Sequence, residues 1–410
     1  MAADRSIEFD FDRIDGLIAE EEAALEPKHK ASIAYRTVAE RYVAGGVASS
    51  WQDSRPHAIF IDHGRGDRIY DIDGNEYIDF HLGYGAMVVG HAHPLIVDAI
   101  EKAAHGGTHF AQPTKDLGVI GENLADRFKL PLWRFANSGT ETTLEAIRLM
   151  RANTGRDMLI KIEGSYHGHH DSIMFSVGPD RSQIGPREHP ITVPQAMGIP
   201  QAFADLVRVV PFNDLVEARR AFEENPGKIA GMIVEPAMMN CGVILPEAGY
   251  LEGLKELCHE HGAYLFRPVI EAEYDMAGTF NGNPLTMAAT RTTLTEVLTP
   301  DVYEQFNRVD KAMKDGLTSV AERYRLPCYV TGVGAKGSVI YSKQRVREYR
   351  DAVGIDERIS YLAWLFQQNR GVFKSPWTTQ ETWTLSVFHT EDDAARYVAN
   401  FEEFAAAVAS

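Results

Sequence analysis

The chain has 410 residues and a formal net charge of −17 at pH 7, with 44% hydrophobic and 24% charged residues. This length accommodates one large domain with a smaller companion, and the composition is that of an ordinary globular protein. An acidic chain is repelled by nucleic acid and by anionic lipid surfaces. Neither is therefore expected as a partner.

The cysteines and the N-terminus predict a compartment. Cys241, Cys258 and Cys328 are far apart and follow no metal-ligand spacing, so we expect reduced thiols and no bound metal. The first ten residues are acidic rather than basic and then apolar, as a signal peptide would be. No apolar run approaches the length of a bilayer span. We therefore expect a cytoplasmic protein without a membrane partner.

The N-terminal part, residues 1–93, is predicted to be a helical segment followed by a β-hairpin. Residues 11–43 have helical character and end at a Gly-Gly pair. Residues 69–72 and 76–79 alternate in polarity around the turn sequence Asp73-Gly74-Asn75. Such a turn between alternating segments is typical of a hairpin.

Residues 94–325 have the rhythm of an α/β domain. Predicted strands cover 132–136, 158–162, 206–210, 232–235 and 263–266, and predicted helices cover 140–153, 214–223 and 249–261. Short apolar strands alternating with helices indicate a mostly parallel sheet covered on both faces. The proline-rich stretch 164–205 is expected to be an active-site loop.

The last part of the chain has a different character. A long helical region follows Pro284 and runs to about residue 325. Residues 326–410 then combine strands expected at 339–341 and 385–387 with helices expected at 358–368 and 391–407. This mixture predicts a small α+β C-terminal domain.

The strongest local motif is FANSGTE at residues 135–141, where a predicted strand runs into a helix. Backbone N–H groups at a helix N-terminus, beside the hydroxyls of Ser138 and Thr140, form a phosphate site. The alternative is a plain N-cap with Glu141 near the first turn. The motif alone leaves both interpretations open.

The second motif is EGSYHGHH at residues 163–170, directly after a predicted strand. Open α/β sheets bind ligands at their strand ends. Tyr166 could stack on a planar ring, with His167 at the ring's edge. Metal binding by His167, His169 and His170 is a weaker alternative, because the run lacks a recognised zinc spacing.

Two further motifs follow. Glu235, in VEP at residues 234–236, is an ionisable group at a strand end that apolar packing does not explain. It could equally cap a helix or form an ion pair at the rim. Thr279 lies in the loop AGTFNGNPL at residues 277–285, which could supply a second hydroxyl to a phosphate or simply begin a helix.

Taken together, the motifs resemble a known family. In order they are YDIDGN (70–75), GHAHP (90–94), NSGTE (137–141), YHG (166–168), VEP (234–236) and GTFNGNP (278–284). The series resembles the class III pyridoxal-phosphate aminotransferases, nearest the branch of glutamate-1-semialdehyde aminomutases and β-amino-acid aminotransferases. The resemblance runs from residue 44 onward. It implies the type I aminotransferase fold, an α/β fold with a large mixed-sheet domain and a small α+β domain.

The resemblance also implies a cofactor site for pyridoxal 5′-phosphate, built from Ser138, Gly139, Thr140, Tyr166, His167, Asn213, Glu235 and Thr279. The first three would hold the phosphate. Tyr166 would stack on the ring beside His167, while Glu235 and Asn213 would lie in the same pocket. Thr279 would reach the phosphate of the neighbouring subunit, which implies a homodimer with the cofactor site at its interface. The substrate would be a small amino acid or amino aldehyde.

The chain departs from the family after Phe266. The family continues there with an Asp that pairs with the ring nitrogen, and later with a strand ending in the lysine that forms the Schiff base. Here Phe266 is followed by Arg267-Pro268, and the Gly278-Thr279 loop comes shortly after. No catalytic residue is therefore assigned. The cofactor is expected to bind non-covalently at best.

No other lysine stands where the family needs one. Lys161 lies inside a predicted strand, Lys336 in the C-terminal domain, and Lys228 and Lys255 in a loop and on a helix face. The missing segment should also remove interior strands from the sheet. Either residues 132–136 move to pair with residues 263–266, or the domain is compromised.

Three hypotheses follow, in order of preference. The first is a family enzyme impaired by the missing segment. The second is a non-catalytic relative that binds a phosphate ligand or a partner subunit. The third is a metal-dependent hydrolase that uses the histidine run at residues 167–170.

Overall fold

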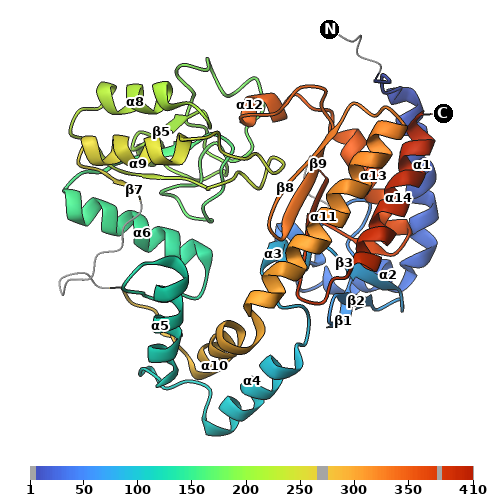
Figure 1. The fold of residues 1–410 in the computed structure, drawn as a ribbon, viewed down its shortest axis with the longest axis horizontal. Coiled ribbons are helices and arrows are strands. Elements are labelled where there is room, and N and C mark those ends of the chain that lie inside the picture. The colour runs from blue at the N-terminus through green and yellow to red at the C-terminus, as the bar shows by residue number, and fades with distance from the viewer. Residues whose placement is uncertain (1–5, 266–275, 376–380, 410) are drawn as a thin grey trace. The chain divides into compact units, whose positions relative to one another are not determined.

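The computed structural model describes residues 6–265, 276–375 and 381–409. The chain divides into two compact units (Figure 1): unit 1 comprises residues 1–97, 296–345 and 355–410, and unit 2 comprises residues 98–295 and 346–354. The N-terminal segment thus groups with the C-terminal part. The division into consecutive segments at residues 93 and 325 stays a prediction.

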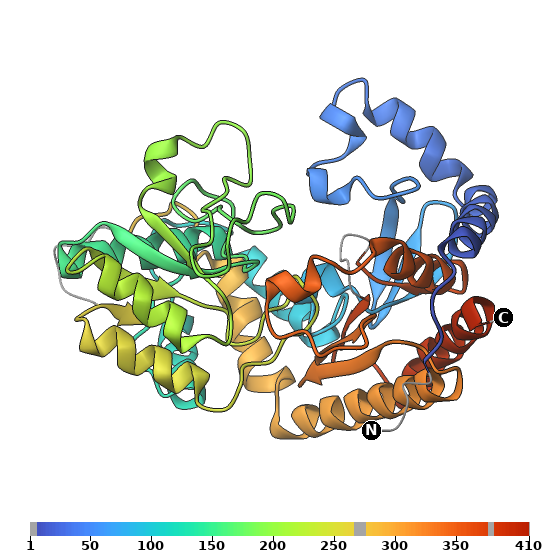
Figure 2. The same ribbon diagram turned by 90° about the horizontal axis from the view of Figure 1, so that it is seen from above.

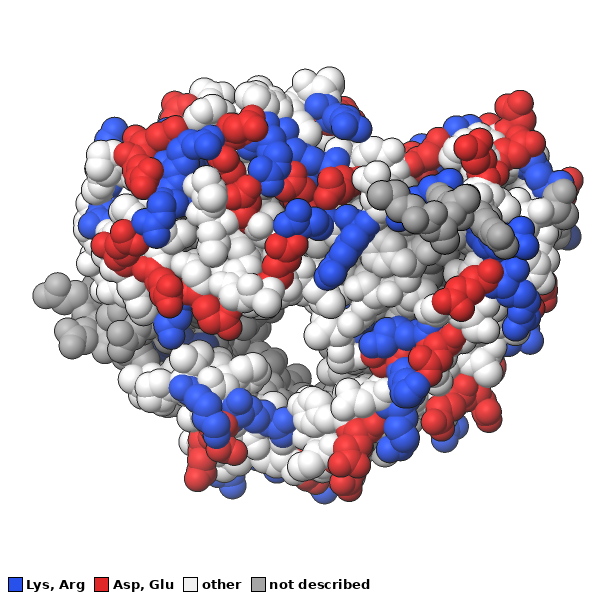
Figure 3. Space-filling view, turned by 45° about the horizontal axis from the view of Figure 1, so that its top comes forward, with Lys and Arg blue, Asp and Glu red and all other residues white. Residues whose placement is uncertain are grey.

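The described residues include no helix that is both long and apolar enough to cross a membrane. On the face seen in Figure 3, Lys and Arg side chains are interspersed with Asp and Glu rather than gathered by sign. The net charge of −17 is therefore not concentrated in one patch of that face.

Unit 1 contains two small sheets and a set of helices. Its helices are α1 (Phe11–Leu25), α2 (Lys30–Ala39), α3 (Leu82–Gly85), α11 (Pro300–Arg323), α13 (Glu357–Asn369) and α14 (Glu391–Ala409), with short turns η1 (Glu26–Lys28), η2 (Ala44–Gly46) and η3 (Ser50–Gln52). Its first sheet has the order β1 (Ile61–Arg65), β2 (Arg68–Asp71), β3 (Glu76–Asp79), β10 (Val372–Phe373). Its second sheet has the order β11 (Glu381–Thr384), β9 (Lys336–Ile340), β8 (Tyr329–Val333).

The core of unit 1 lies between the helices and the second sheet. Helix α11 packs on α14, and α1 packs on α13. Trp383, Tyr397, Phe401 and Phe404 are almost fully buried there. Gly337 has no room for a side chain, since a Cβ atom would lie 2.0 Å from the Trp383 ring.

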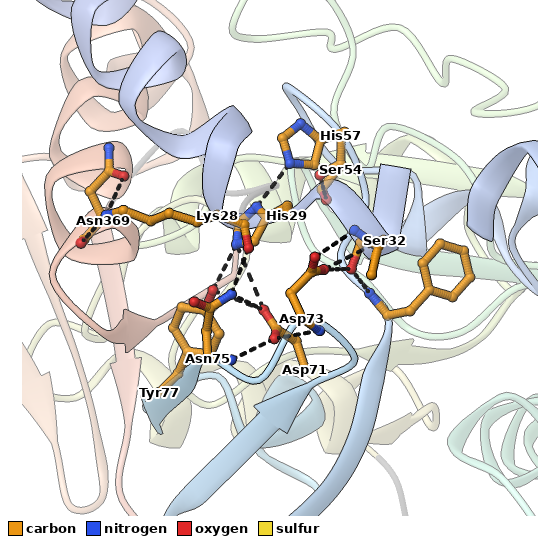
Figure 4. A network of polar contacts seen from close by, with 12 residues as sticks. Lys28, His29, Ser32, Ser54, His57, Asp71, Asp73, Asn75, Tyr77 and Asn369 are labelled. Atoms are coloured by element: carbon orange, nitrogen blue, oxygen red, sulfur yellow. Dashed lines mark hydrogen bonds and ion pairs between the residues drawn. The ribbon is translucent and has the colours of Figure 1, made fainter. Parts of the chain in front are cut away.

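The predicted hairpin forms, with β2 and β3 antiparallel around residues 72–75. A buried polar network joins this hairpin to the start of α2 (Figure 4). His29 contacts His57 Nε2 through Nδ1 at 2.8 Å and the Tyr77 hydroxyl through Nε2 at 2.7 Å. Tyr77 in turn donates to the Asp71 carboxylate. The contacts attach the first turn of α2 to the hairpin.

Unit 2 contains the parallel sheet. Its helices are α5 (Asp116–Phe128), α6 (Gly139–Thr154), α7 (Gln201–Ala204), α8 (Leu215–Glu224), α9 (Tyr250–Glu260), α10 (Pro284–Thr292) and α12 (Tyr349–Ala352). Helix α4 (Pro94–Gly106) and the π-helical turn η4 (Thr293–Val297) each cross from one unit to the other along the sequence.

Four parallel strands form the sheet of unit 2, in the order β5 (Val207–Val210), β4 (Met158–Ile162), β6 (Ile229–Ile233), β7 (Tyr264–Leu265). Strands β4 and β6 are buried along their whole length, which fits their continuous apolar sequences. Helix α6 packs on β6, where a Cβ atom on Gly231 would lie 2.2 Å from Met150 Sδ. Helices α8 and α9 lie side by side (Figures 1 and 2).

The strand predicted at residues 132–136 is wrong. These residues have no strand assignment in the structure, and the Leu132 side chain is 55% exposed. Among the described residues, β7 pairs with β6 alone, so residues 132–136 have not moved over to β7. An apolar segment becomes a strand only where a neighbouring strand supplies hydrogen bonds, and no strand of the described residues pairs with this segment.

Other boundaries need smaller corrections. The strand expected at 232–235 is β6, which begins and ends earlier. The strand expected at 385–387 is wrong, because β11 ends at Thr384. The helical region after Pro284 is interrupted, and α11 starts anew with Pro300 at its first position, where a proline loses no hydrogen bond. Of the predicted strand 263–266, Phe266 lies outside the described residues.

Candidate active site

The phosphate motif begins a long helix. Ser138 is the N-cap of the 16-residue helix α6, and its hydroxyl accepts a hydrogen bond from Glu141 N at 3.2 Å. The Glu141 carboxylate accepts from Asn137 N at 2.7 Å, so the residue before the N-cap is also bonded to the first turn of the helix. Helix geometry leaves the first-turn N–H groups without carbonyl partners inside the helix. An ideal Cβ on Gly139 would meet no atom within 4 Å, so there is open space beside these donors.

The turn at residues 166–170 lies directly against this helix N-terminus. His169 N donates to Thr140 Oγ1 at 3.0 Å, and Thr143 Oγ1 donates to the His167 carbonyl at 2.5 Å. Gly168 has φ of +99°, and a Cβ there would lie 2.8 Å from Thr140 Cα. Only glycine allows this approach. The structure therefore brings the two strongest motifs together into one site.

Glu235 supports the same turn from the end of β6. Its Oε1 accepts from Tyr166 N at 2.8 Å, and its Oε2 accepts from Met239 N at 3.0 Å. This explains why an ionisable group follows a buried strand, since a carboxylate that accepts backbone N–H bonds is stabilised in its charged form. The predicted position of Glu235 beside a cofactor ring stays a prediction.

His167 is the most deeply buried histidine of the turn, with 8% of its surface exposed. Burial, reinforced by Lys161, lowers its pKa to about 3, so the imidazole is neutral. Its Nε2 atom is buried and has no hydrogen-bond partner among the described residues. A buried polar atom without a partner is a group that a ligand can satisfy.

The histidine run does not form a metal site. Within the described ranges, no three His, Cys, Asp or Glu side chains are placed to hold a metal ion. His170 Nε2 instead lies 3.3 Å from Thr143 Oγ1. The geometry gives no support to the metal-hydrolase hypothesis.

A buried lysine that the sequence did not assign to the site contacts this turn. Lys161 on β4 is fully buried, and its Nζ donates to the carbonyls of Ser165 at 2.6 Å and Phe175 at 2.7 Å. Burial lowers the pKa of Lys161 to about 7, although Glu235 and Glu163 act in the opposite direction. The only available sequence signal was a lysine in an otherwise apolar strand.

Glu163, which is 1% exposed, forms a two-armed ion pair with Arg350, with N–O distances of 2.7 and 2.9 Å. Burial raises the pKa of Glu163, and Arg350 opposes that shift. Arg350 also donates to the carbonyls of Ile184 and Gly185. The partners are 187 residues apart in sequence, so sequence reasoning had no means of pairing them.

The other two predicted site residues lie in different surroundings. The Asn213 amide donates to the carbonyls of Leu245 and Arg347 and accepts from Glu247 N, so it is engaged with neighbouring loops. Thr279 is exposed in its loop. The cofactor contacts predicted for both stay predictions.

Comparison with known proteins identifies the family. The aminotransferase class-III model matches residues 49–267, which is more than half of the chain. The chain belongs to the class III aminotransferase family. It is 33% identical over 418 residues to glutamate-1-semialdehyde 2,1-aminomutase 1 of Staphylococcus carnosus, covering 89% of this chain and 95% of that protein. A Bacillus licheniformis aminomutase is 33% identical over 408 residues, covering 87% of this chain and 93% of that protein.

Solved structures agree on the fold. An ω-transaminase from Sphaerobacter thermophilus has a TM-score of 0.84 and 27% identity, covering 92% of this chain and 97% of that chain. A Pseudomonas aeruginosa glutamate-1-semialdehyde aminomutase in complex with PMP has a TM-score of 0.88 and 24% identity, covering 98% and 100%. The type I aminotransferase fold predicted from the sequence is confirmed, and pyridoxal phosphate is the cofactor of this family.

The comparisons are consistent with a departure from the family after Phe266. The family match ends at residue 267, one residue after Phe266. Because 89% of the 410-residue chain is about 365 residues, an alignment over 418 residues includes about 50 positions that this chain lacks. The residues present fit the phosphate and one edge of the ring, through the α6 N-terminus and His167 Nε2. By the resemblance, the family's lysine has no counterpart in the sequence, and the loss of a covalent link stays a prediction.

Proposed function

We propose that this chain is a class III family protein that binds pyridoxal phosphate without a covalent link and is impaired in amino-group transfer. The observation that carries the proposal is the end of the family match at residue 267. The phosphate-binding and ring-binding segments lie before that point, and the segment that bears the family's lysine and ring-nitrogen carboxylate would follow it.

The residues present support cofactor binding more than they support amino-group transfer. The α6 N-terminus and the Ser138 and Thr140 hydroxyls would hold the phosphate, because partial positive charge and donors converge there. Tyr166 would face the ring, and His167 would donate or accept one hydrogen bond at its edge. The bound cofactor would supply an electron sink. A desolvated lysine that moves the proton has no counterpart at the expected place.

Substrate and assembly are proposed from family membership. The named relatives are aminomutases and transaminases, so we propose a small amino acid or amino aldehyde as substrate. We also propose a homodimer in which Thr279 contributes to the neighbouring site. A cytoplasmic location is proposed from the three cysteines, which form no disulfide among the described residues.

The test is a cofactor titration followed by borohydride reduction. We expect saturable binding of pyridoxal phosphate that dialysis reverses, and no pyridoxyl group on any peptide after reduction and mass spectrometry. Mixing the protein with pyridoxamine phosphate and a keto acid should give amino acid very slowly or not at all. A pyridoxyl-labelled lysine or rapid transfer would contradict impairment, whereas absence of any binding would contradict the cofactor assignment.

The non-catalytic relative is the second candidate, and a specific observation favours it. The phosphate-binding helix and the YHG turn are well connected although the family's lysine is absent. A non-catalytic relative should show the same reversible cofactor binding but no residual amino-group transfer, even at millimolar substrate. Slow transfer that disappears on removal of the cofactor would favour the impaired enzyme.

A further inference from the structure

One peptide unit at the start of the turn at residues 166–170, here called the ring-binding turn, is held by two side chains, those of Lys161 and Glu235. The carbonyl of the Ser165–Tyr166 peptide accepts from Lys161 Nζ at 2.6 Å. The N–H of the same peptide donates to Glu235 Oε1 at 2.8 Å. An amine therefore binds the oxygen end of this peptide and a carboxylate binds its nitrogen end.

The two hydrogen bonds of the Ser165–Tyr166 peptide are stronger than ordinary contacts within a turn. Lys161 and Ser165 are fully buried, and Tyr166 and Glu235 are partly buried. Hydrogen bonds to ionised groups are about twice as strong as neutral ones, and burial strengthens them further. Lys161 Nζ also donates to the Phe175 carbonyl, so both ends of the loop segment 165–175 are attached to β4. Rotation of the 165–166 peptide plane would break bonds at both of its ends.

The orientation of that peptide plane sets the direction in which the Tyr166 side chain leaves the backbone. The next residues along the chain, His167 and Gly168, contact α6. We propose that Lys161 is a positioning residue for the cofactor site: together with Glu235 it fixes the Ser165–Tyr166 peptide and so presents Tyr166 and His167 to the cofactor. This inference rests on the proposed cofactor binding.

Lys161 acts here through hydrogen bonds and not as the missing reactive amine. Its Nζ already serves two carbonyls and is fully buried. Reaction with an aldehyde would require those bonds to break. Borohydride reduction in the presence of pyridoxal phosphate should therefore leave the peptide containing Lys161 unlabelled.

The experiment compares Lys161→Met, Lys161→Gln and the control Lys255→Met. Methionine fits the buried position but has no donor, glutamine keeps an uncharged donor, and Lys255 is an exposed lysine on α9. Cofactor affinity, the visible circular dichroism of bound pyridoxal phosphate and hydrogen exchange of a peptide covering residues 163–176 are measured for each protein.

We expect Lys161→Met to weaken cofactor affinity about 10- to 100-fold. It should abolish the induced dichroism and speed exchange across residues 163–176. Lys161→Gln should fall between Lys161→Met and the wild type, and it decides the matter if the methionine variant does not fold. Glu235→Gln should act in the same direction, and the Lys161→Met/Glu235→Gln double variant should lose less than the two single losses combined, because both act on one peptide.

The outcomes separate this inference from the proposed function. If the wild type binds no pyridoxal phosphate, the cofactor assignment is wrong, and hydrogen exchange still tests the anchoring of the turn. If Lys161→Met behaves as Lys255→Met does in affinity, dichroism and exchange, the positioning role is overturned. A pyridoxyl label on Lys161 would overturn it as well.

Discussion

Ser138 shows how one side chain can serve both structure and binding. Its hydroxyl caps α6, and it stands where a phosphate would be held. The sequence left a plain cap and a phosphate site as alternatives, and the two are compatible in the structure. The cap fixes the direction of the helix, and the open space beside Gly139 leaves room for an anion.

Substitutions at Ser138 can separate the two roles. Ser138→Ala should lower the free energy of unfolding by about 1 kcal/mol, because it removes the N-cap. Ser138→Asp should keep the stability, because aspartate is a good N-cap, and yet weaken cofactor affinity at least about tenfold, because its charge repels a phosphate. Chemical denaturation and cofactor titration give the two quantities. Unchanged affinity in the aspartate variant would place the phosphate elsewhere.

At the scale of single residues, the motifs predicted the groups that would face a ligand and did not indicate the residues that hold these groups in place. The motifs identified Ser138, Gly139, Thr140, Tyr166 and His167, which the structure brings together. Lys161 binds backbone carbonyls 4 and 14 residues further along the chain, and Arg350 binds a buried carboxylate 187 residues away. No local pattern marks such contacts.

At the scale of elements, the attachment of α2 to the hairpin depends on neutral histidines. Burial lowers the pKa of His29 to about 4 and also lowers that of His57, while Asp71 and Asp73 act in the opposite direction on His29. His29 Nδ1 and His57 Nε2 lie 2.8 Å apart (Figure 4), and Lys28, Tyr77 and Asp71 complete the surroundings. Two protonated rings could not share this hydrogen bond.

Acid should therefore destabilise unit 1. Because the folded-state pKa of His29 lies below the ordinary 6.5, the unfolded chain binds a proton first as the pH falls. The contribution of His29 to the free energy of unfolding is complete above pH 6.5 and falls by about 3 kcal/mol between pH 6.5 and about 4. Urea denaturation at pH 7.5, 6 and 5 measures the loss.

The matched variants are His29→Gln and His63→Gln. His29→Gln should flatten the decline between pH 6.5 and 5, because glutamine does not titrate. His63 is exposed, with 60% of its side chain accessible, and its replacement should leave the decline as in the wild type. An unchanged slope in His29→Gln would assign the acid sensitivity to other groups.

At the scale of the whole molecule, we expect the missing segment to account for both the proposed impairment and the small sheet. Unit 2 has four parallel strands, and the segment 132–136 has no strand partner among the described residues. Phe128 and Leu132, on either side of the turn after α5, are 61% and 55% exposed. Apolar side chains of this size are normally covered, so the missing strands should have covered this region.

Restoring the segment should repair both defects. We expect a chimaera carrying the corresponding residues of the Staphylococcus carnosus aminomutase between Phe266 and Arg267 to unfold at a higher temperature. Its residues 132–136 should become protected from hydrogen exchange, because new strands supply hydrogen bonds. It should also retain pyridoxal phosphate after borohydride reduction and denaturation.

The control chimaera has alanine in place of the inserted lysine. It should be as stable as the first chimaera and lose the covalent cofactor. If neither chimaera gains stability or protection, the absent residues are not interior strands of this sheet.

The family, the type I fold, the phosphate and ring motifs and the proposed loss of the catalytic lysine were predictable from the sequence by itself, because each depends on residues adjacent in the chain. Tertiary structure alone decided that residues 132–136 form no strand, that Glu235 contacts the turn at residues 166–170 and that Arg350 pairs with Glu163. A strand exists only when a neighbour pairs with it, and a buried charge is stable only beside its partner. Both conditions are set by residues far away in sequence.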